Sequence, residues 1–181
     1  MNRFLDRLYR AAKLDVNLFD EVVADKGAMF QSMMAVFVYS MASAYGNFAR
    51  AGVYGINFGM ITTLFGWYIW AVSIYFIAVR LVPEVPVSVD RKAMLRALGF
   101  ASSPGLLRLL GLLPDLSGIA IVISSIWMVA AAAVAIKQML NFQSTTRAVV
   151  VCIISWVISG VFQVLVYTLL LSVFGIPANP L

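Results

Sequence analysis

The sequence contains no histidine and only one cysteine, and both shortages exclude kinds of chemistry. Without histidine, the chain lacks the most versatile general base and the usual axial ligand of haem or bacteriochlorophyll. Cys152 has no second cysteine to pair with, so an internal disulfide is excluded. The sequence also has no Ser-His pair, no glycine-rich phosphate loop and no metal-ligand cluster. We therefore predict a protein that is not an enzyme, with no catalytic residue and no metal site.

Charge is scarce as well, and this shortage indicates the class of protein. Charged residues make up 12% of the chain and hydrophobic residues 62%, whereas soluble proteins average about 25% charged residues. The chain is therefore predicted to be an integral membrane protein that contacts lipids and other membrane proteins, with no nucleic-acid partner. Its 181 residues have room for one domain of spans of about 20 residues each.

The first 27 residues differ from the rest, since they hold five of the thirteen basic and five of the eight acidic residues. Charges this frequent exclude a secretory signal peptide. Phe4, Leu8 and Ala12 recur at helical spacing, which is typical of an amphipathic helix in the headgroup region. A second short helix is expected to follow, with Asn17 as its N-cap. Residues 1–27 are thus predicted to form a cytoplasmic or interfacial segment that orients the chain or docks a partner.

Apolar segments follow along the remainder of the chain. They cover residues 28–49, 56–79, 93–113, 118–140 and 149–175, and a short tail occupies residues 177–181. Four are clearly long enough to cross a bilayer. The third, 93–113, is interrupted by the run Ser102, Ser103, Pro104 and Gly105, so it could either cross as a broken helix or dip into the membrane and return.

The distribution of Lys and Arg favours five crossings. With five spans, eleven basic residues lie on the side of the N-terminus and two, Arg50 and Arg108, on the other; with a re-entrant third segment the ratio is ten to three. By the positive-inside rule the N-terminus is then cytoplasmic. We predict an all-α bundle of five transmembrane helices, residues 28–176, with a non-cytoplasmic C-terminus.

A break inside the third span has structural requirements. Proline removes a backbone donor and disturbs the preceding turn, and unsatisfied backbone groups in hydrocarbon cost several kcal/mol each. Ser102 and Ser103 can supply local hydrogen bonds, and we expect protein to surround the break. Arg96 and Arg108 lie near the two ends of the segment, where their long side chains are expected to reach the headgroup layers.

Small residues mark faces where helices can approach closely. Gly55 and Gly59 have GxxxG spacing, Gly66 and Ser73 continue the same face, and Gly160 lies in the fifth span. Such faces indicate close helix packing, either within the chain or between copies of it.

Unusual residues coincide in depth near the middle of the spans. Trp67, Trp70 and Trp127 lie away from the interfacial belts where tryptophan is usually found, and Gln163 is central in the last span. All four are predicted to lie at the depth of the break, where Gln163 should bond to a neighbouring helix, an indole N–H or exposed carbonyls. Two interpretations stay open: a packed polar clasp, or a groove that holds a lipid tail, a quinone or a carotenoid.

Several stretches resemble the Ypt-interacting protein (Yip) family in its prokaryotic branch. They include "LDVNLFDEVVADKGA", "GWYIWAVSIYFIAVRL", "GFASSPGLL" and "IKQMLNFQSTTRAV", and the resemblance covers residues 14–175. It implies a polytopic, five-span protein of a prokaryotic cytoplasmic membrane with a cytoplasmic N-terminus. Eukaryotic members associate with prenylated small GTPases and shape vesicle traffic, and their long cytosolic N-terminal region is nearly missing here. The resemblance implies no catalytic residue.

Together these observations predict a non-catalytic Yip-like adaptor or scaffold that binds other membrane proteins or lipids. The alternative is an accessory subunit of a large photosynthetic or respiratory complex that holds lipid, quinone or carotenoid. A transporter is less favoured, because no predicted span contains an acidic residue that could relay protons.

Overall fold

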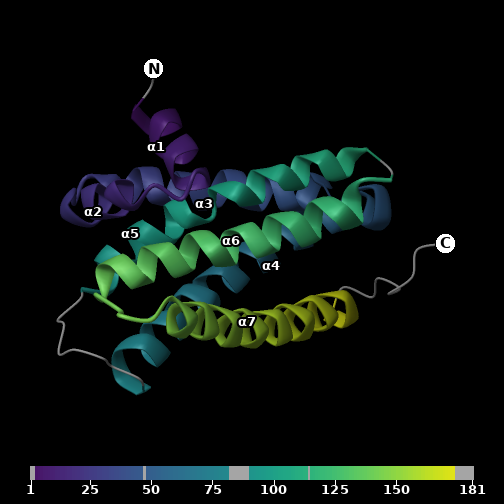
Figure 1. Cartoon of the computed structure of the whole chain (residues 1–181). Helices are drawn as coiled ribbons and strands as arrows, with labels where there is room; N and C mark the ends of the chain where they lie inside the picture. The colour runs from purple at the N-terminus through teal and green to yellow at the C-terminus, as the bar shows by residue number, and fades with distance from the viewer. Residues whose placement is uncertain (1–2, 47, 82–89, 114, 174–181) are drawn as a thin grey trace.

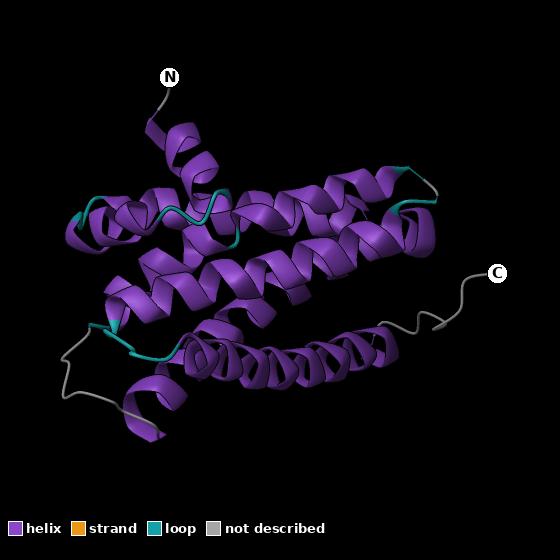
Figure 2. Cartoon of the chain, in the orientation of Figure 1, coloured by secondary structure: helices purple, strands orange, loops and turns teal. Residues whose placement is uncertain are grey.

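The computed structural model describes residues 3–46, 48–81, 90–113 and 115–173, and it contains helices and loops but no strand in these residues (Figures 1 and 2). The α-helices are α1 (Arg3–Ala12), α2 (Val16–Ala24), α3 (Ala28–Gly46), α4 (Phe48–Phe76), α5 (Arg91–Ala101), α6 (Ser117–Met139) and α7 (Thr145–Val173). A π-helical turn, η1 (Ile77–Leu81), extends α4, and a 3-10 helix, η2 (Ser103–Leu112), follows α5.

Each of the five predicted apolar segments contains helix in the structure. Three helical stretches are long and apolar enough to cross a membrane: Phe58–Leu81, Ser117–Met139 and Thr145–Leu170. α3 and the α5–η2 segment are not among them. The described residues therefore show an all-helical membrane protein with three candidate spans, and the predicted tail at 177–181 lies outside them.

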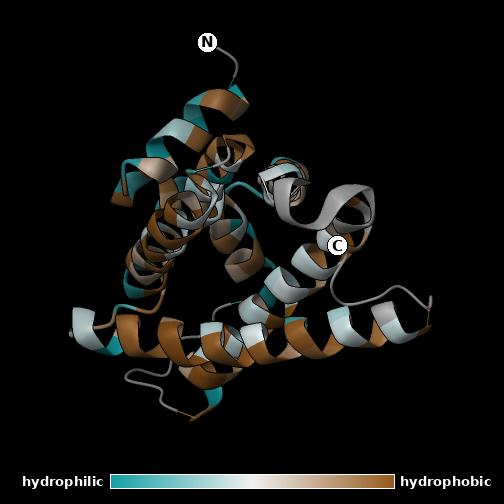
Figure 3. Cartoon of the chain, turned by 90° about the vertical axis from the view of Figure 1, so that its right-hand side faces the viewer, coloured by the Kyte–Doolittle hydropathy of each residue, from teal (hydrophilic) through white to brown (hydrophobic). Residues whose placement is uncertain are grey.

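The long elements form a closed ring. α3 packs against α4 and η2, α7 packs against α4 and α6, and α6 packs against η2. Figure 1 shows α6 between the α3–η2 pair and α7. Figure 3 shows that hydrophilic residues gather near the N-terminus, whereas hydrophobic residues follow the long helices. Side chains that point into this ring are therefore shielded from the surroundings of the bundle.

The α5–η2 segment runs beside α3 in the same direction. The backbone at Gly99 touches Ser32, that at Gly105 touches the ring of Tyr39, and Gly111 lies against the backbone of Gly46. Each contact is so close that a Cβ atom on the glycine would collide with its neighbour. The third segment thus advances along α3 from Ser32 to Gly46 and does not turn back.

The helix type changes at the Ser-Ser-Pro-Gly run. α5 ends at Ala101, and the Ser102 hydroxyl donates to the Gly99 carbonyl at 2.6 Å. Pro104 follows in the first turn of η2, where its missing N–H leaves no bond unmade. The Gly105 N–H donates to the Ser102 carbonyl at 2.9 Å. In total η2 is ten residues long, although most 3-10 stretches are no longer than about four.

The cap of α2 corrects the sequence prediction. Asp15, not Asn17, is the N-cap: its carboxylate accepts the Asn17 N–H at 3.0 Å. An Asp side chain in extended backbone just before the helix is well placed to accept such a bond. Asn17 already lies inside the helix, so its backbone N–H is the donor that needs a cap.

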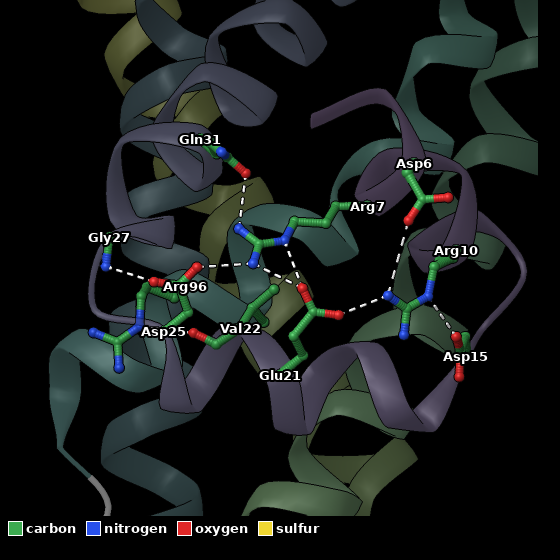
Figure 4. Close-up of polar contacts among 10 residues, drawn as sticks. All are labelled: Asp6, Arg7, Arg10, Asp15, Glu21, Val22, Asp25, Gly27, Gln31 and Arg96. Atoms are coloured by element: carbon green, nitrogen blue, oxygen red, sulfur yellow. Dashed lines mark hydrogen bonds and ion pairs between the residues drawn. The ribbon is translucent and has the colours of Figure 1, made fainter. Parts of the chain in front are cut away.

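A network of ion pairs joins α1 to α2 and α3 (Figure 4). Arg7 is 1% exposed and donates to Glu21 at 2.7 and 2.9 Å, to Asp25 at 2.8 Å and to Gln31 at 2.8 Å. Arg10 donates to Asp15 at 2.7 Å and to Glu21 at 2.6 Å. The N-terminal segment is therefore a folded unit; we call α1 and α2 together the N-terminal platform.

The arginines of this network set the charge state of its acids. Hydrogen bonds from Arg10 and Arg7 lower the pKa of Glu21, and a hydrogen bond from Arg10 lowers the pKa of Asp15. A hydrogen bond from Arg7 lowers the pKa of Asp25. All three carboxyls are thus held in the charged form that binds arginine.

Further hydrogen bonds hold the N-terminal platform on the bundle, among them one from Gln138 of α6 to Asp20 of α2 at 2.8 Å. Arg96 of α5 is buried and donates to the carbonyls of Val22 at 2.9 Å and Val23 at 2.5 Å. The Trp127 indole donates to the Ala12 carbonyl at 2.8 Å. The sequence predicts that Arg96 reaches a headgroup layer; in the structure it binds the last carbonyls of α2, which have no partner within the helix. Trp127 is central in α6, so the end of α1 lies along the side of the bundle.

Candidate functional site

A small cavity lies inside the ring, where α3, α4, α6, α7 and η2 meet. It is lined by Tyr39, Gly66, Trp67, Trp70, Arg108, Ser125, Met128, Val129, Trp156, Ser159 and Gln163. Its volume is about 50 Å³, which is room for a few water molecules and too little for a quinone or a carotenoid. The structure thus gathers three predicted residues, Trp67, Trp70 and Gln163, around one polar cavity.

Arg108 supplies the charge of this cavity. Its guanidinium donates to the hydroxyls of Ser43 at 3.0 Å, Ser124 at 3.2 Å and Ser125 at 3.0 Å. It also lies 5.2 Å from the centre of the Tyr39 ring. Among the described residues it forms no ion pair. The prediction that Arg108 extends to a headgroup layer is wrong, because three hydroxyls inside the bundle take the place of water.

Trp67 carries a polar atom without a partner. The side chain is 6% exposed, and its indole N–H has no hydrogen-bond acceptor among the described residues. The neighbouring Trp70 differs, since its indole donates to the Cys152 carbonyl at 3.3 Å. A buried donor left unpaired costs about 1–3 kcal/mol. Trp67 therefore has an unused hydrogen-bond donor on a side chain that lines the cavity.

Gln163 lies against Gly66, where a Cβ atom on the glycine would collide with the amide group. Its amide donates to the hydroxyl of Ser159 at 3.2 Å, one turn earlier in α7. Ser159 in turn donates to the Gly66 carbonyl at 2.6 Å. The link to a neighbouring helix that the sequence predicts for Gln163 thus runs through Ser159, not through an indole or the break.

The break and Trp127 lie apart from the cavity. Trp127, Ser103 and Pro104 line a shallow concavity against α1, together with Leu5 and Tyr9. Gly105 comes closer, because the Tyr39 ring and Met128 that pack on it also line the cavity. Ser102 is buried and bonds within its own turn. The residues predicted to lie at one depth therefore divide between two surfaces.

Of the small residues that are predicted to pack between helices, some lie in close helix contacts and others do not. Gly59 packs on Ala44 of α3 and Gly66 on Gln163 of α7, while Ser73 is half-buried. The surroundings of Gly55 lie outside the described residues. No described atom lies within 4 Å of the position that a Cβ on Gly160 would take.

An open apolar groove adjoins the cavity on the side of α6 and α7. Its volume is about 510 Å³, and it is lined by Ile121, Val122, Ser125, Ile126, Val129, Ala130, Val149, Ile153 and Trp156. This volume is in the range typical of small-molecule sites. Ser125, Val129 and Trp156 line both the groove and the cavity. A polar cavity and an apolar groove therefore lie side by side.

The residues that sequence reasoning missed at this site are Arg108 and its hydroxyl partners. The sequence signal that could have indicated them is the adjacent pair Ser124 and Ser125 within the apolar segment 118–140, together with Ser43 in the segment 28–49. An arginine inside a bundle needs such acceptors. Which serines face Arg108 depends on how α3, η2 and α6 pack, which the sequence pattern alone does not give.

The cavity offers hydrogen-bond donors and can therefore bind a ligand that accepts hydrogen bonds. Arg108 has five N–H groups, of which three are used by serines, and Trp67 has one more to donate. No group of three His, Cys, Asp or Glu side chains able to hold a metal occurs among the described residues. No protein-family model, no curated protein and no solved structure matches this chain.

Proposed function

We propose that this chain is a non-catalytic, Yip-like adaptor of a prokaryotic cytoplasmic membrane that binds other membrane proteins or lipids. In this proposal five helical segments cross the bilayer, with the N-terminus in the cytoplasm. The observation that carries the proposal is the N-terminal platform, a charged and folded unit held on an otherwise apolar bundle by Arg96 and Trp127. A charged unit held at a fixed position on the bundle, with the end of α1 along its side, suits recruitment of other membrane proteins or lipids.

The course of the third segment supports five crossings. α5 and η2 contain eleven and ten residues, and because a 3-10 helix rises more per residue, the two together can extend about 35 Å. The hydrocarbon layer is about 30 Å thick. The close contacts from Gly99 on Ser32 to Gly111 on Gly46 run parallel to α3, as a crossing requires and a re-entrant loop does not.

A topology reporter tests the crossing number. Fused after Leu181, a reporter that is active only outside the cytoplasm should be active, and a reporter active only in the cytoplasm should be silent. The opposite result would mean that the number of crossings is even.

A charge-reversal experiment tests the adaptor role. Lys13 and Lys26 are exposed just after α1 and α2, and the double variant Lys13→Glu, Lys26→Glu reverses these two charges without touching the Arg7 network. After cross-linking in native membranes, this variant should lose partners that the unaltered protein retains. The control Asp115→Lys, at the other end of α6, should keep them. An unchanged set of cross-linked partners in the double variant would contradict the proposal.

The exposed face of α7 favours the second candidate, an accessory subunit of a large energy-converting complex. In its apolar stretch only 22% of residues are buried, compared with 50% in α6. Val161, Val164, Leu165 and Leu169 are each more than half exposed. Such a face suits lipid or another transmembrane helix. A quinone or carotenoid is too large for the Arg108 cavity, so it would have to occupy the groove between α6 and α7.

Purification from native membranes in mild detergent, followed by mass spectrometry, separates the two candidates. Stoichiometric comigration with a redox or light-harvesting complex, with pigment absorbance in the purified sample, would support the accessory subunit. Migration alone or with variable partners would support the adaptor.

A further inference from the structure

We propose that the cavity beside Arg108 binds the carboxylate of a long-chain fatty acid, whose acyl chain lies in the groove between α6 and α7. This inference goes beyond the proposed function and does not depend on it. It rests on three observations of the site: an arginine without a described carboxylate partner, a buried indole without an acceptor, and an apolar groove that adjoins both.

The charge of Arg108 indicates an anionic group. Arginine stays protonated in proteins, and a cation inside a membrane bundle is costly unless it is paired. The hydroxyls of Ser43, Ser124 and Ser125 solvate the guanidinium but do not neutralise it. Because the serines use three of its five N–H groups, two remain, the number that a carboxylate can accept.

Trp67 gives an independent indication of a ligand. Its side chain is more than nine-tenths buried, it lines the same cavity as Arg108, and its indole N–H has no described acceptor. A carboxylate oxygen is an acceptor only. One such group can therefore satisfy the charge of Arg108 and the unpaired indole together.

The shapes of the two spaces select a single-chain acid. The cavity, at about 50 Å³, admits a group as small as a carboxylate and excludes a glycerophosphate headgroup. The groove beside it is open, apolar and about 510 Å³ in volume. Ser125, Val129 and Trp156 border both spaces, so the two spaces adjoin, and in this proposal the acyl chain passes between them beside these residues.

Tryptophan fluorescence provides the test. The full-length protein, reconstituted in vesicles of phosphatidylcholine, is titrated with a dibrominated stearic acid, because bromine quenches tryptophan on contact and Trp156 lies in the groove. We expect the acid to quench tryptophan fluorescence in a saturable way. Its methyl ester lacks the charge, so it should give only the weak, non-saturating quenching of a lipid dissolved in the bilayer. Arg108→Gln should weaken binding of the acid at least tenfold, while Arg80→Gln, which removes an exposed arginine from η1, should not.

A second variant keeps the test decisive if Arg108→Gln fails to fold. Trp67→Phe keeps an aromatic side chain but removes the unpaired N–H together with one ring of the indole, so it should still fold, at a modest cost in stability, and bind the acid several-fold more weakly. Equal quenching by acid and ester would overturn the proposal, as would saturable quenching by a brominated phosphatidic acid instead of the fatty acid. Unchanged affinity in both variants, or no saturable quenching at all, would also overturn it and leave water as the occupant.

Discussion

Arg7 and Arg108 both bind other groups of the protein, but their surroundings differ. Arg7 contacts the carboxylates of Glu21 and Asp25, which neutralise it and join α1 to α2. Arg108 contacts hydroxyls from three serines and no described carboxylate. A paired arginine has completed its interactions within the fold, whereas an arginine that is only solvated by hydroxyls still attracts an anion. The comparison assigns Arg7 to structure and Arg108 to binding.

The largest expected effect follows from Arg7→Gln. The change removes charge-assisted bonds to Glu21 and Asp25 and should destabilise the protein by about 2 to 3 kcal/mol, less than for a fully buried pair because both carboxylates can regain water. Thermal unfolding in detergent measures the loss. Arg91→Gln, at an exposed position, is the matched control. Arg108→Gln should cost less stability, since it leaves no carboxylate unpaired; an equal loss at Arg7 and Arg108 would remove the distinction between them.

A second change tests how Arg108 is positioned. A Cβ atom at Gly46 would collide with the backbone oxygen of Arg108, so Gly46→Ala must displace η2 from α3. Overpacking of this kind costs about 2 kcal/mol. Gly160→Ala adds the same methyl group where nothing lies within 4 Å and should leave the unfolding temperature unchanged or slightly raised. Equal effects of the two substitutions would show that close backbone contact does not position Arg108.

A smaller effect is expected at the contact between the N-terminal platform and α6. Trp127→Phe keeps an aromatic ring but loses the hydrogen bond to the Ala12 carbonyl, worth about 1 kcal/mol. Trypsin should then cleave faster after Lys13, which follows α1, while the bundle resists as before. Trp156→Phe, in the α6–α7 groove, is the control. If cleavage after Lys13 is no faster than in the control, the Trp127 bond does not hold the platform.

The smallest effect concerns pH. The arginine bonds lower the pKa of Glu21 from 4.5 and of Asp15 and Asp25 from 3.8. A lowered carboxyl pKa adds stability that is complete above the unfolded value and is lost as the pH falls through the folded one. Between pH 7 and 4.5 the platform should therefore keep its protease resistance, and below 4.5 it should lose resistance gradually. Loss that is already complete at pH 6 would contradict this assignment.

The helices could be predicted from the sequence because apolar runs and interrupting charges are local signals. The predicted segment 118–140 and the observed α6, Ser117–Met139, differ by one residue at each end. The interruption at Ser102–Gly105 also coincides with the end of α5. Whether a helix caps at Asp15 or Asn17 depends on side-chain geometry over two residues, and the two types are nearly equal as caps.

The orientations of Arg96 and Arg108 could not be predicted in the same way. Position near the end of a hydrophobic segment indicates an arginine that extends toward the headgroups. Arg96 turns instead toward carbonyls 73 and 74 residues away, and Arg108 toward Ser43, 65 residues away. Contacts at such separations depend on which helices are neighbours in the ring. The same reason explains why Trp67 and Gln163 share a cavity while Trp127 does not.

The hydroxyl partners of Arg108 have a consequence for how the chain enters the bilayer during synthesis. When η2 leaves the ribosome, only Ser43 of α3 is already present, because Ser124 and Ser125 belong to α6 and are translated later. If η2 crosses the bilayer as proposed, an arginine exposed to lipid opposes its insertion, by up to about 3 kcal/mol at the centre of a span and by less near its end. We expect η2 to remain at the translocon until α6 has been synthesised. The two helices would then insert into the bilayer as a hairpin, with the Arg108 guanidinium enclosed between them.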